Sequence, residues 1–456
     1  MEITLPEKFL QRMKSLLNDD YEAFINEYTL QPLKGLRVNT LKCTADKLQQ
    51  LLDVKLTPSP FSPLSYYIEG NIKLGNNPLH HCGAYYLQEP SASCAVTALD
   101  IQQGDKVLDL CAAPGGKSTQ IATLLNGTGL IWSNEIVKKR AQILLSNIER
   151  MGIKNSVVSS LSPEVLCPKL QGYFDKVLVD APCSGEGMFR KDAQAITEWT
   201  EEHTKSCMER QLQILESAKL CLKEGGVLVY STCTFSPYEN EGVINEFIKN
   251  NPDFTLVDCL QGTDIDFGRA GIDMPQARRI YPMDGGEGHF VAKLIKQSEA
   301  TGYTANEPEE NPKTLKANAN IIKQANQLYQ DIFKGLNTPI FTVVNDKIII
   351  KPKETPILAG TGVIRSGILF GEIKKNRIEP AHNIFTTGCK DDFNNVVDLD
   401  VNSPQINSYL LGEEISVNDN IKGYTAVCVN GITLGFGKCS NGQLKNKYPK
   451  GLRKVK

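Results

Sequence analysis

The sequence predicts an α/β protein: a doubly wound parallel sheet, preceded by a small α+β domain and followed by a strand-rich module. Short apolar strands alternate with helical segments over residues 106–231, a pattern typical of parallel sheets. Within that region, residues 106–125 read as a strand, a Pro-Gly-Gly turn and a helix, the opening of a nucleotide-binding α/β domain. Beyond residue 340, strand-like segments with regular turns predict a small mixed or barrel-like β-structure.

The individual elements are expected where apolar runs of strand length, or runs of helical period, lie between turn residues. We expect the strands of the sheet, in chain order, at residues 107–110, 130–133, 156–159, 176–180 and 227–231, with two more at 251–258 and 289–296. We expect the helices that accompany them at residues 117–125, 137–151 and 207–222.

Composition divides the chain into four regions. Residues 1–80 read as an accessory α+β domain, and residues 81–296 as the domain of the parallel sheet. The polar stretch 297–312 is the best candidate for a linker. Residues 313–456 form the C-terminal module, which opens on a helical segment at 313–335.

Bulk properties exclude several classes of protein. The chain has no run of 18 apolar residues and no apolar signal-peptide segment at its start, so we expect a cytoplasmic protein without a membrane partner. Its 13 cysteines are too widely spaced for a disulfide framework or a compact zinc cluster, so we expect no metal site. The net charge is −2, but residues 438–456 carry seven basic side chains and no acidic one. That asymmetry indicates a polyanionic partner; a solubilising tail is the alternative.

The turn at residues 111–117 is the candidate ligand site. Gly116-Lys117-Ser118 looks like the end of a phosphate-binding loop, but that loop requires a glycine where Cys111 stands. The fingerprint G-x-G-x-x-G of dinucleotide-binding folds is also absent, which leaves a different adenosyl ligand. Glu135, just past the second strand, stands where such folds place a carboxylate that grips the ribose. A solvated surface charge is the alternative for Glu135.

Three cysteines fall at the carboxyl ends of expected strands: Cys111, Cys183 and Cys233. Asp180 ends the fourth strand, which usually neighbours the fifth, so we expect Asp180, Cys183 and Cys233 to converge beside the ligand. A thiolate beside a carboxylate indicates covalent catalysis, such as addition to C6 of a pyrimidine so that C5 can accept a methyl group. The alternative is that these cysteines fill the core. That is what we expect of Cys43, Cys94, Cys167, Cys207, Cys221, Cys259, Cys389, Cys428 and Cys439.

Three motifs together carry a resemblance to a known family. LDLCAAPGGKST at 108–119, DAPCSGEGMF at 180–189 and STCTFSPYENE at 231–241 closely resemble the motifs of the Nol–Nop–Sun family of RNA (cytosine-5) methyltransferases. RVNTLK, YYLQEPSA and RIYPMDGGEGHFVAKL extend the likeness to about residue 296. NGQLKNKYPKGLR at 441–453 is similar to the C-terminal module of RsmF-type ribosomal RNA methyltransferases. The expected sheet domain is then a Rossmann-like S-adenosylmethionine-dependent methyltransferase domain, and the end of the chain is PUA-like.

The resemblance implies S-adenosylmethionine as the cofactor and gives roles to single residues. It implies that Cys233 is the nucleophile, that Cys183, on a mobile Ser-Gly-Glu-Gly loop, helps to release the product, and that Asp180 lies near both methionine and base. It implies that Glu135 holds the ribose. Ser162 stands where the family often has an aspartate that contacts adenine, and a hydroxyl makes a weaker hydrogen bond than a carboxylate. The implied cofactor loop comprises Cys111, Ala112, Ala113, Pro114, Gly115, Gly116 and Lys117.

The resemblance also implies an RNA substrate whose target base is unstacked. We expect small-subunit (16S) ribosomal RNA; transfer RNA is the alternative within the same chemistry, and a non-catalytic RNA-binding assembly factor is the alternative without it. A DNA methyltransferase would need Cys183 as nucleophile and a DNA-reading domain, so we expect no DNA partner. We expect a monomer, with the strand that carries Arg37 and Lys42 and the basic C-terminal module as RNA clamps.

Overall fold

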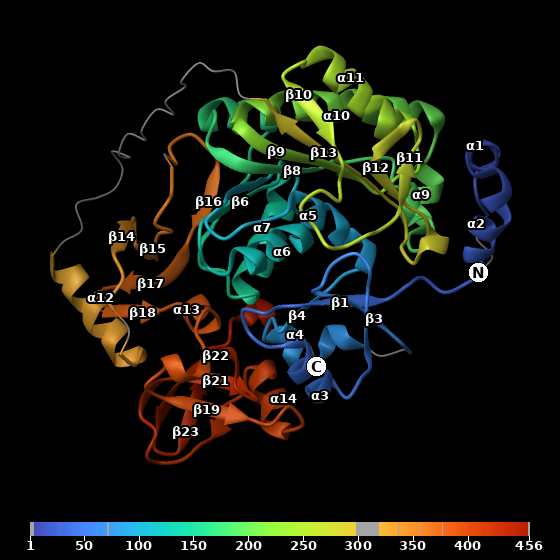
Figure 1. The fold of residues 1–456 in the computed structure, drawn as a ribbon. Helices are drawn as coiled ribbons and strands as arrows, with labels where there is room; N and C mark the ends of the chain where they lie inside the picture. The colour runs from blue at the N-terminus through green and yellow to red at the C-terminus, as the bar shows by residue number, and fades with distance from the viewer. Residues whose placement is uncertain are drawn as a thin grey trace.

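The computed structural model describes residues 4–70, 73–297, 319–335, 337–356, 358–375 and 377–454. A large central sheet has helices on both faces, a smaller N-terminal sheet lies below it in the view, and two further sheets form the C-terminal end of the chain (Figure 1). Most of the predicted linker 297–312 and the start of the predicted helix 313–335 lie outside the described residues. Among the helices of the described ranges, none combines the length and the apolar character needed to cross a membrane.

The central sheet has ten strands, and its core is parallel. Strand β5 pairs in parallel with β6 and β8, β6 with β7, and β8 with β9, whereas the outer strands are antiparallel. The predicted doubly wound α/β class is therefore confirmed. The spatial order is β11 (Arg269–Gly271), β12 (Met274–Ile280), β13 (His289–Lys296), β9 (Leu222–Thr232), β8 (Phe174–Asp180), β5 (Lys106–Asp109), β6 (Leu130–Asn134), β7 (Ser156–Ser159) and β16 (Val363–Ser366), with β10 (Phe254–Val257) on β13.

Two hydrophobic cores lie on the two faces of this sheet. Successive strand residues point to opposite faces, so Val107 packs in one core and Leu108 in the other. The core of Val107 is covered by α5 (Cys94–Leu99), α6 (Gly116–Leu125) and α7 (Lys138–Arg150). The core of Leu108 is covered by α8 (Pro163–Leu166), α10 (Glu201–Cys221) and α11 (Val243–Asn250). Burial on both faces explains why these strands read as continuous apolar runs.

Several elements differ from the predicted bounds. Strand β9 begins at Leu222, five residues before the expected 227, since Leu222 already pairs with Phe174 of β8 and Lys223 forms an ion pair with Asp175 on that strand. Helix α10 begins at Glu201 rather than 207, since the Thr200 hydroxyl accepts a hydrogen bond from the backbone of His203. The sequence patterns did not reveal β11, β12 or β16 as strands of the sheet.

The N-terminal region divides into a helical pair and a sheet. Helices α1 (Glu7–Leu17) and α2 (Tyr21–Glu27) lie apart from the small sheet and pack on the domain of the central sheet, against Phe189, Trp199 and Phe235 (Figure 1). The antiparallel sheet reaches past residue 80, where the first domain was expected to end. Its order is β2 (Leu56–Pro58), β3 (Ser65–Ile68), β1 (Gly35–Val38) and β4 (Tyr85–Leu87), with α3 (Ala45–Leu52) and α4 (Pro78–His81) beside it.

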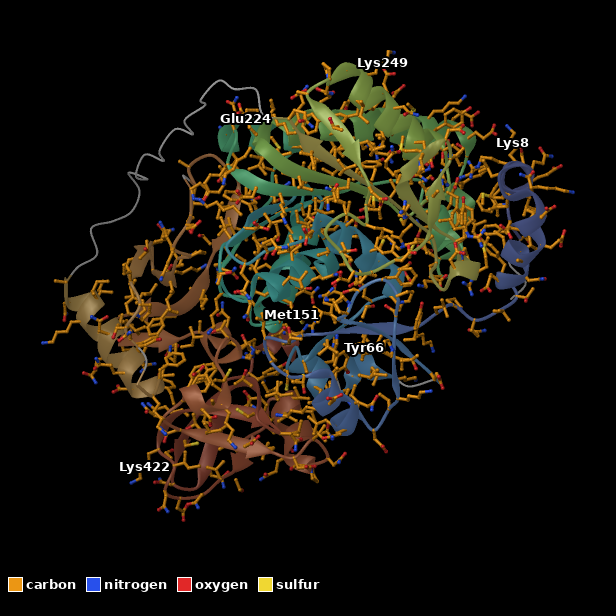
Figure 2. The ribbon with its side chains drawn as sticks, viewed as in Figure 1. Lys8, Tyr66, Met151, Glu224, Lys249 and Lys422 are labelled. Carbon is orange, nitrogen blue, oxygen red and sulfur yellow. The ribbon has the colours of Figure 1, made fainter. Side chains whose placement is uncertain are left out.

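The expectation that Arg37 and Lys42 grip RNA is wrong. Arg37 is fully buried, and Lys42 donates hydrogen bonds to the backbone oxygens of Cys82 and Arg150. Arg37 lies on β1, between β3 and β4, and meets protein on every side, whereas Lys42 follows the strand and is partly exposed. Met151, labelled near the middle of the molecule in Figure 2, accepts a hydrogen bond from Asn39 at the same junction.

The C-terminal region is strand-rich, as predicted, and forms two sheets. The first, packed on α12 (Ala319–Ile332), has the order β14 (Phe341–Val344), β15 (Lys347–Ile350), β17 (Ile368–Lys374) and β18 (Arg377–Pro380). Helix α13 (His382–Thr386) leads to the second sheet, which shares a core with the N-terminal sheet. Its order is β19 (Val396–Leu399), β21 (Gly423–Val429), β22 (Ile432–Ser440), β23 (Gln443–Asn446) and β20 (Ile415–Ser416), with α14 (Pro404–Leu411) alongside.

Candidate active site

The carboxyl ends of β5, β6, β8 and β9 enclose a cavity of about 410 Å³. In parallel α/β sheets this edge is where ligands bind, and the volume falls within the range of small-molecule sites, roughly 300–1,000 Å³. The walls come from residues within 110–113, 134–140, 163–164, 180–183 and 210–214, together with Cys233.

Two thiols face each other in this cavity. The Sγ atoms of Cys183 and Cys233 are 3.3 Å apart, and the backbone N–H of Cys233 lies 3.4 Å from Cys183 Sγ. Both side chains are partly exposed, whereas the other cysteines are buried except Cys111, which is partly exposed, and Cys389, which is exposed and not the core residue we expected. The hydrogen bond with Cys233, together with burial, raises the pKa of Cys183 well above its ordinary value, so this thiol keeps its proton at neutral pH.

The loop that carries Cys183, which was expected to be mobile, makes several backbone hydrogen bonds in the structure. The backbone N–H of Ser184 donates to Glu239, and that of Gly187 donates to the carbonyl of Cys233 at 2.9 Å. Gly187 is also required by packing, because a Cβ there would meet the backbone oxygen of Gly288 at 2.8 Å. These contacts hold the two cysteine-bearing loops against each other.

Asp180 borders the same cavity, as predicted for the residue that ends β8. Its carboxylate accepts hydrogen bonds from Lys117 Nζ at 2.8 Å and from Ser231 Oγ at 2.7 Å. Burial alone would lower the pKa of Lys117, but the charge of Asp180 and its hydrogen bond outweigh burial and raise it. Lys117 is therefore a permanent cation that holds Asp180 at the cavity wall, on the side of the thiols.

Four of the predicted cofactor residues line the cavity: Cys111, Ala113, Glu135 and Asp180. Glu135 is only 3% exposed and accepts a hydrogen bond from the backbone N–H of Val137. Burial and nearby carboxylates raise the pKa of Cys111 well above its ordinary value, so Cys111 is an uncharged wall residue and not a nucleophile.

The glycine turn shapes the cavity without lining it. Gly115 has φ 113°, a left-handed conformation that favours glycine, and a Cβ there would approach Leu144 of α7 to 3.1 Å. The glycine therefore lets the turn pack against α7, which holds it through a hydrogen bond from Asn147 to the Pro114 carbonyl. Predicted residues that do not line the cavity are Ala112, Pro114, Gly115, Gly116, Lys117 and Ser162. Ser162 stands directly before the lining residues Pro163 and Glu164.

Sequence reasoning missed several residues of the site. Asn134 bridges the carbonyls of Leu110 and Leu161 through its side-chain amide, and Arg140 pairs with Glu135 at 3.3 Å and donates to the Ala113 carbonyl. Arg210 and Gln213 of α10 form the opposite wall. Arg140 and Arg210 stand on helices whose polar residues are mostly solvated, so no sequence signal distinguished them.

The cavity fits an adenosyl ligand that reaches toward a reactive pair of thiols. Glu135 places a buried carboxylate on the cavity wall, beside Ile136 and Pro163. The thiols and Asp180 occupy the other part of the wall. A doubly wound sheet with this arrangement at its carboxyl edge defines a protein of the S-adenosylmethionine-dependent methyltransferase class.

Sequence comparison identifies the family. Ribosomal RNA small subunit methyltransferase F of Vibrio vulnificus (strain YJ016) is 34% identical over 473 residues, covering 99% of this chain and 98% of its own. The chain therefore belongs to the family of that enzyme, and it is an S-adenosylmethionine-dependent RNA methyltransferase. The predicted family, activity and cofactor are confirmed.

Family matches and solved structures agree with this assignment. Residues 96–295 match 16S rRNA methyltransferase RsmB/F, and residues 5–90 match the N-terminal domain of 16S rRNA methyltransferase RsmF. Residues 315–385 match the first C-terminal domain of RsmF, and residues 396–454 match its PUA domain. The crystal structure of NSun6 from Pyrococcus horikoshii with SFG, an analogue of S-adenosylmethionine, is 25% identical with a TM-score of 0.59, covering 66% of this chain and 100% of that one. A methyltransferase homolog protein from the same organism is 28% identical with a TM-score of 0.57, covering 64% of this chain and 96% of that one.

Proposed function

We propose that this chain methylates C5 of a cytosine in small-subunit ribosomal RNA, with Cys233 as the nucleophile. The observation that carries the proposal is that Cys183, Cys233 and Asp180 open into the same cavity as Glu135. The substrate follows the names of the relatives, which are small-subunit enzymes, and for that reason we prefer ribosomal RNA to transfer RNA. The intact thiol pair argues against a non-catalytic assembly factor.

The cavity residues divide the chemistry among them. Cys233 adds as a thiolate to C6 of the base, which makes C5 nucleophilic. When bound, S-adenosylmethionine supplies the methyl group that C5 accepts, and Cys111, Ala113 and Glu135 line its side of the cavity. Asp180, fixed by Lys117, is placed to accept a hydrogen bond from the exocyclic amine of cytosine and to stabilise the adduct as it forms.

Release of the product requires loss of the C5 proton to solvent and departure of the Cys233 thiolate from C6. Cys183 lies 3.3 Å away, sulfur to sulfur, close enough to protonate the departing thiolate. Its raised pKa means that Cys183 still carries its proton when the Cys233 thiolate departs beside it. The geometry does not decide which of the two thiols is the nucleophile. We assign that role to Cys233, and product release to Cys183, because of the resemblance of their motifs to those of the family.

The experiment is a pair of substitutions followed by transfer of labelled methyl groups to small-subunit RNA. Cys233→Ala should abolish transfer and form no covalent RNA adduct. Cys183→Ala should accumulate an adduct resistant to denaturant, because addition proceeds while elimination slows. Cys389→Ala, an exposed cysteine far from the cavity in sequence, is the control and should behave as wild type. Full transfer by Cys233→Ala would refute the proposal. Labelling of transfer RNA instead of small-subunit RNA would mean that transfer RNA is the substrate.

The finer partner assignments belong to the same proposal. We propose that the protein acts as a monomer, as expected from the sequence. We propose RNA and not DNA as the nucleic acid, because Cys233 and not Cys183 is taken as the nucleophile. We also propose a cytoplasmic location, because the proposed substrate is ribosomal RNA. Sedimentation at working concentration tests the monomer, and a duplex DNA control tests the nucleic acid.

A further inference from the structure

We propose that Glu186 and Glu239 act as a reciprocal clasp that positions the two thiols, each glutamate being a positioning residue for the opposite cysteine loop. This inference rests on the proposed roles of Cys183 and Cys233. Both glutamates are fully buried, at 0% exposure. Removing a carboxylate from water is costly, so two buried carboxylates beside one site must be compensated by the contacts that they make.

The first arm runs from the loop of Cys233 to the loop of Cys183. Glu239 accepts hydrogen bonds from the backbone N–H of Ser184 at 2.8 Å and from its hydroxyl at 2.5 Å. The hydroxyl of Thr234, directly after Cys233, lies 2.8 Å from that of Ser184 and 3.5 Å from the carboxylate. One carboxylate thus contacts the residues that directly follow both cysteines.

The second arm runs in the opposite direction. Glu186, on the loop of Cys183, accepts a hydrogen bond at 3.0 Å from the backbone N–H of Phe235, two residues after Cys233. Each loop therefore contributes a glutamate that is bound by a backbone N–H of the other loop. With two such ties and the Gly187 N–H on the Cys233 carbonyl, the loops cannot separate unless buried acceptors lose their donors.

The two arms have different electrostatic support. Glu186 pairs with Arg12 of helix α1 at 2.6 Å and accepts a hydrogen bond from Trp199 Nε1 at 2.7 Å. Glu239 forms no ion pair among the described residues, and Gln211 Nε2 supplies a further hydrogen bond at 3.0 Å. Burial raises the pKa of Glu239 to about 7. The N-terminal helix is therefore connected to the thiols through Arg12 and Glu186, which gives a function to a segment outside the catalytic domain.

Thiol placement explains why such a clasp is useful. A shift of about 1 Å in a reacting group can cost roughly 100-fold in rate, because the attacking atom leaves its near-attack position. The sulfur separation of 3.3 Å depends on the relative position of two loops that follow different strands, β8 and β9. Carboxylates that bind both loops fix that separation more firmly than either loop could alone.

The test compares Glu239→Gln and Glu186→Gln with Glu149→Gln, a control glutamate on α7 that pairs with Arg365. The first readout is single-turnover methyl transfer to small-subunit RNA, and the second is the rate at which diamide joins Cys183 and Cys233 in a disulfide. We expect each clasp variant to lower the transfer rate at least tenfold, with KM values changed less than twofold, and to slow disulfide formation at least threefold. The control should change neither.

A second variant protects the test against loss of folding. Ser184→Ala removes the hydroxyl that donates to Glu239 and contacts Thr234 but keeps the backbone donor, and we expect a threefold loss in both readouts. Clasp variants that fold and keep wild-type rates of transfer and disulfide formation would overturn the proposal. If the clasp variants do not fold, wild-type rates in the Ser184→Ala protein would overturn it. Transfer that persists in Cys233→Ala would instead refute the proposed function and leave the loop contacts unaffected.

Discussion

Two basic regions of the chain were expected to contact RNA, and the structure gives them opposite environments. Arg37, on strand β1, is fully buried between the N-terminal sheet and the catalytic domain, and Lys42, just past that strand, is partly exposed but donates to backbone oxygens. Lys438, Lys445 and Lys447, on β22 and beyond, are exposed. The difference teaches that a basic residue in a strand indicates a polyanion only if the strand has a free face.

The buried region uses its cations as structural ties. Arg37 donates hydrogen bonds to the Gly116 carbonyl and to Thr119 Oγ1, both at 2.5 Å, and to Gln88 Oε1 at 2.6 Å. No carboxylate pairs with it among the described residues, and burial lowers its pKa to about 9. Arg37 thus joins the N-terminal sheet to the first turn of α6, directly after the glycine turn of the cofactor side.

The exposed region arranges its cations as a row. Lys438 and Lys445 are direct cross-strand partners, and Tyr424 is the partner of Lys438 on the other side. Like charges placed opposite each other destabilise a sheet. An arrangement that costs stability in the free protein is expected where a polyanion supplies the missing counter-charge. The aromatic ring beside the lysines adds a surface on which a base can stack.

Replacement of the buried cation should have the largest effect. Arg37→Met leaves the Gly116 carbonyl and Gln88 without their donor, so we expect the free energy of unfolding to fall by about 3 kcal/mol. Urea denaturation followed by tryptophan fluorescence measures this change. Cofactor binding should weaken as well, because Gly116 begins α6. A variant of wild-type stability that loses only RNA affinity would restore Arg37 as an RNA contact.

The next effect concerns the junction where the C-terminal module meets the N-terminal sheet. His382 is packed there against Tyr448, with ring centroids 5.3 Å apart, and burial lowers its pKa to about 3. Since its folded-state pKa lies below the unfolded value of about 6.5, the unfolded chain binds the proton first, and stability falls as the pH drops below about 6.5.

His382→Phe removes this titration and keeps a ring of similar size. Between pH 7 and pH 5 the wild type should lose about 2 kcal/mol more stability than the variant, as measured by urea denaturation at each pH. Other buried groups, including Asp109 and Glu239 with pKa values raised to about 7, titrate in both proteins and cancel in the comparison. Parallel pH curves for the two proteins would contradict the prediction.

The sequence patterns predicted the elements that obey a simple periodicity. The parallel strands were found because both faces are buried, and the convergence of Asp180, Cys183 and Cys233 followed from their place after neighbouring strands. The clasp could not be predicted, because a glutamate in a loop is usually solvated and only the tertiary structure shows Glu186 and Glu239 buried. Neither could β16, since the pairing of Val363 with Ser159 joins distant parts of the chain.

The smallest effect should come from the exposed row, and it affects binding rather than folding. The triple substitution Lys438→Gln, Lys445→Gln and Lys447→Gln should raise the KM for RNA about tenfold at low salt, with kcat unchanged. The slope of log affinity against log salt should decrease by about 2, because roughly 0.7 counterion is released per phosphate contact. Removing the Lys438–Lys445 repulsion should leave the protein as stable as wild type or slightly more stable.

Salt titrations of RNA binding by fluorescence anisotropy measure this slope. Lys249→Gln is the matched control, since Lys249 projects from α11 at the end of the molecule opposite to Lys422, which precedes β21 (Figure 2). An equal loss of affinity in the control would mean that RNA responds only to the overall charge. An unchanged slope in the triple variant would mean that the row does not touch RNA, and the cost of placing Lys438 opposite Lys445 would then need another cause. If the triple variant alone loses affinity, the two basic regions differ in function as they differ in burial. The region of Arg37 then holds two parts of the protein together, and the exposed lysines bind the RNA substrate.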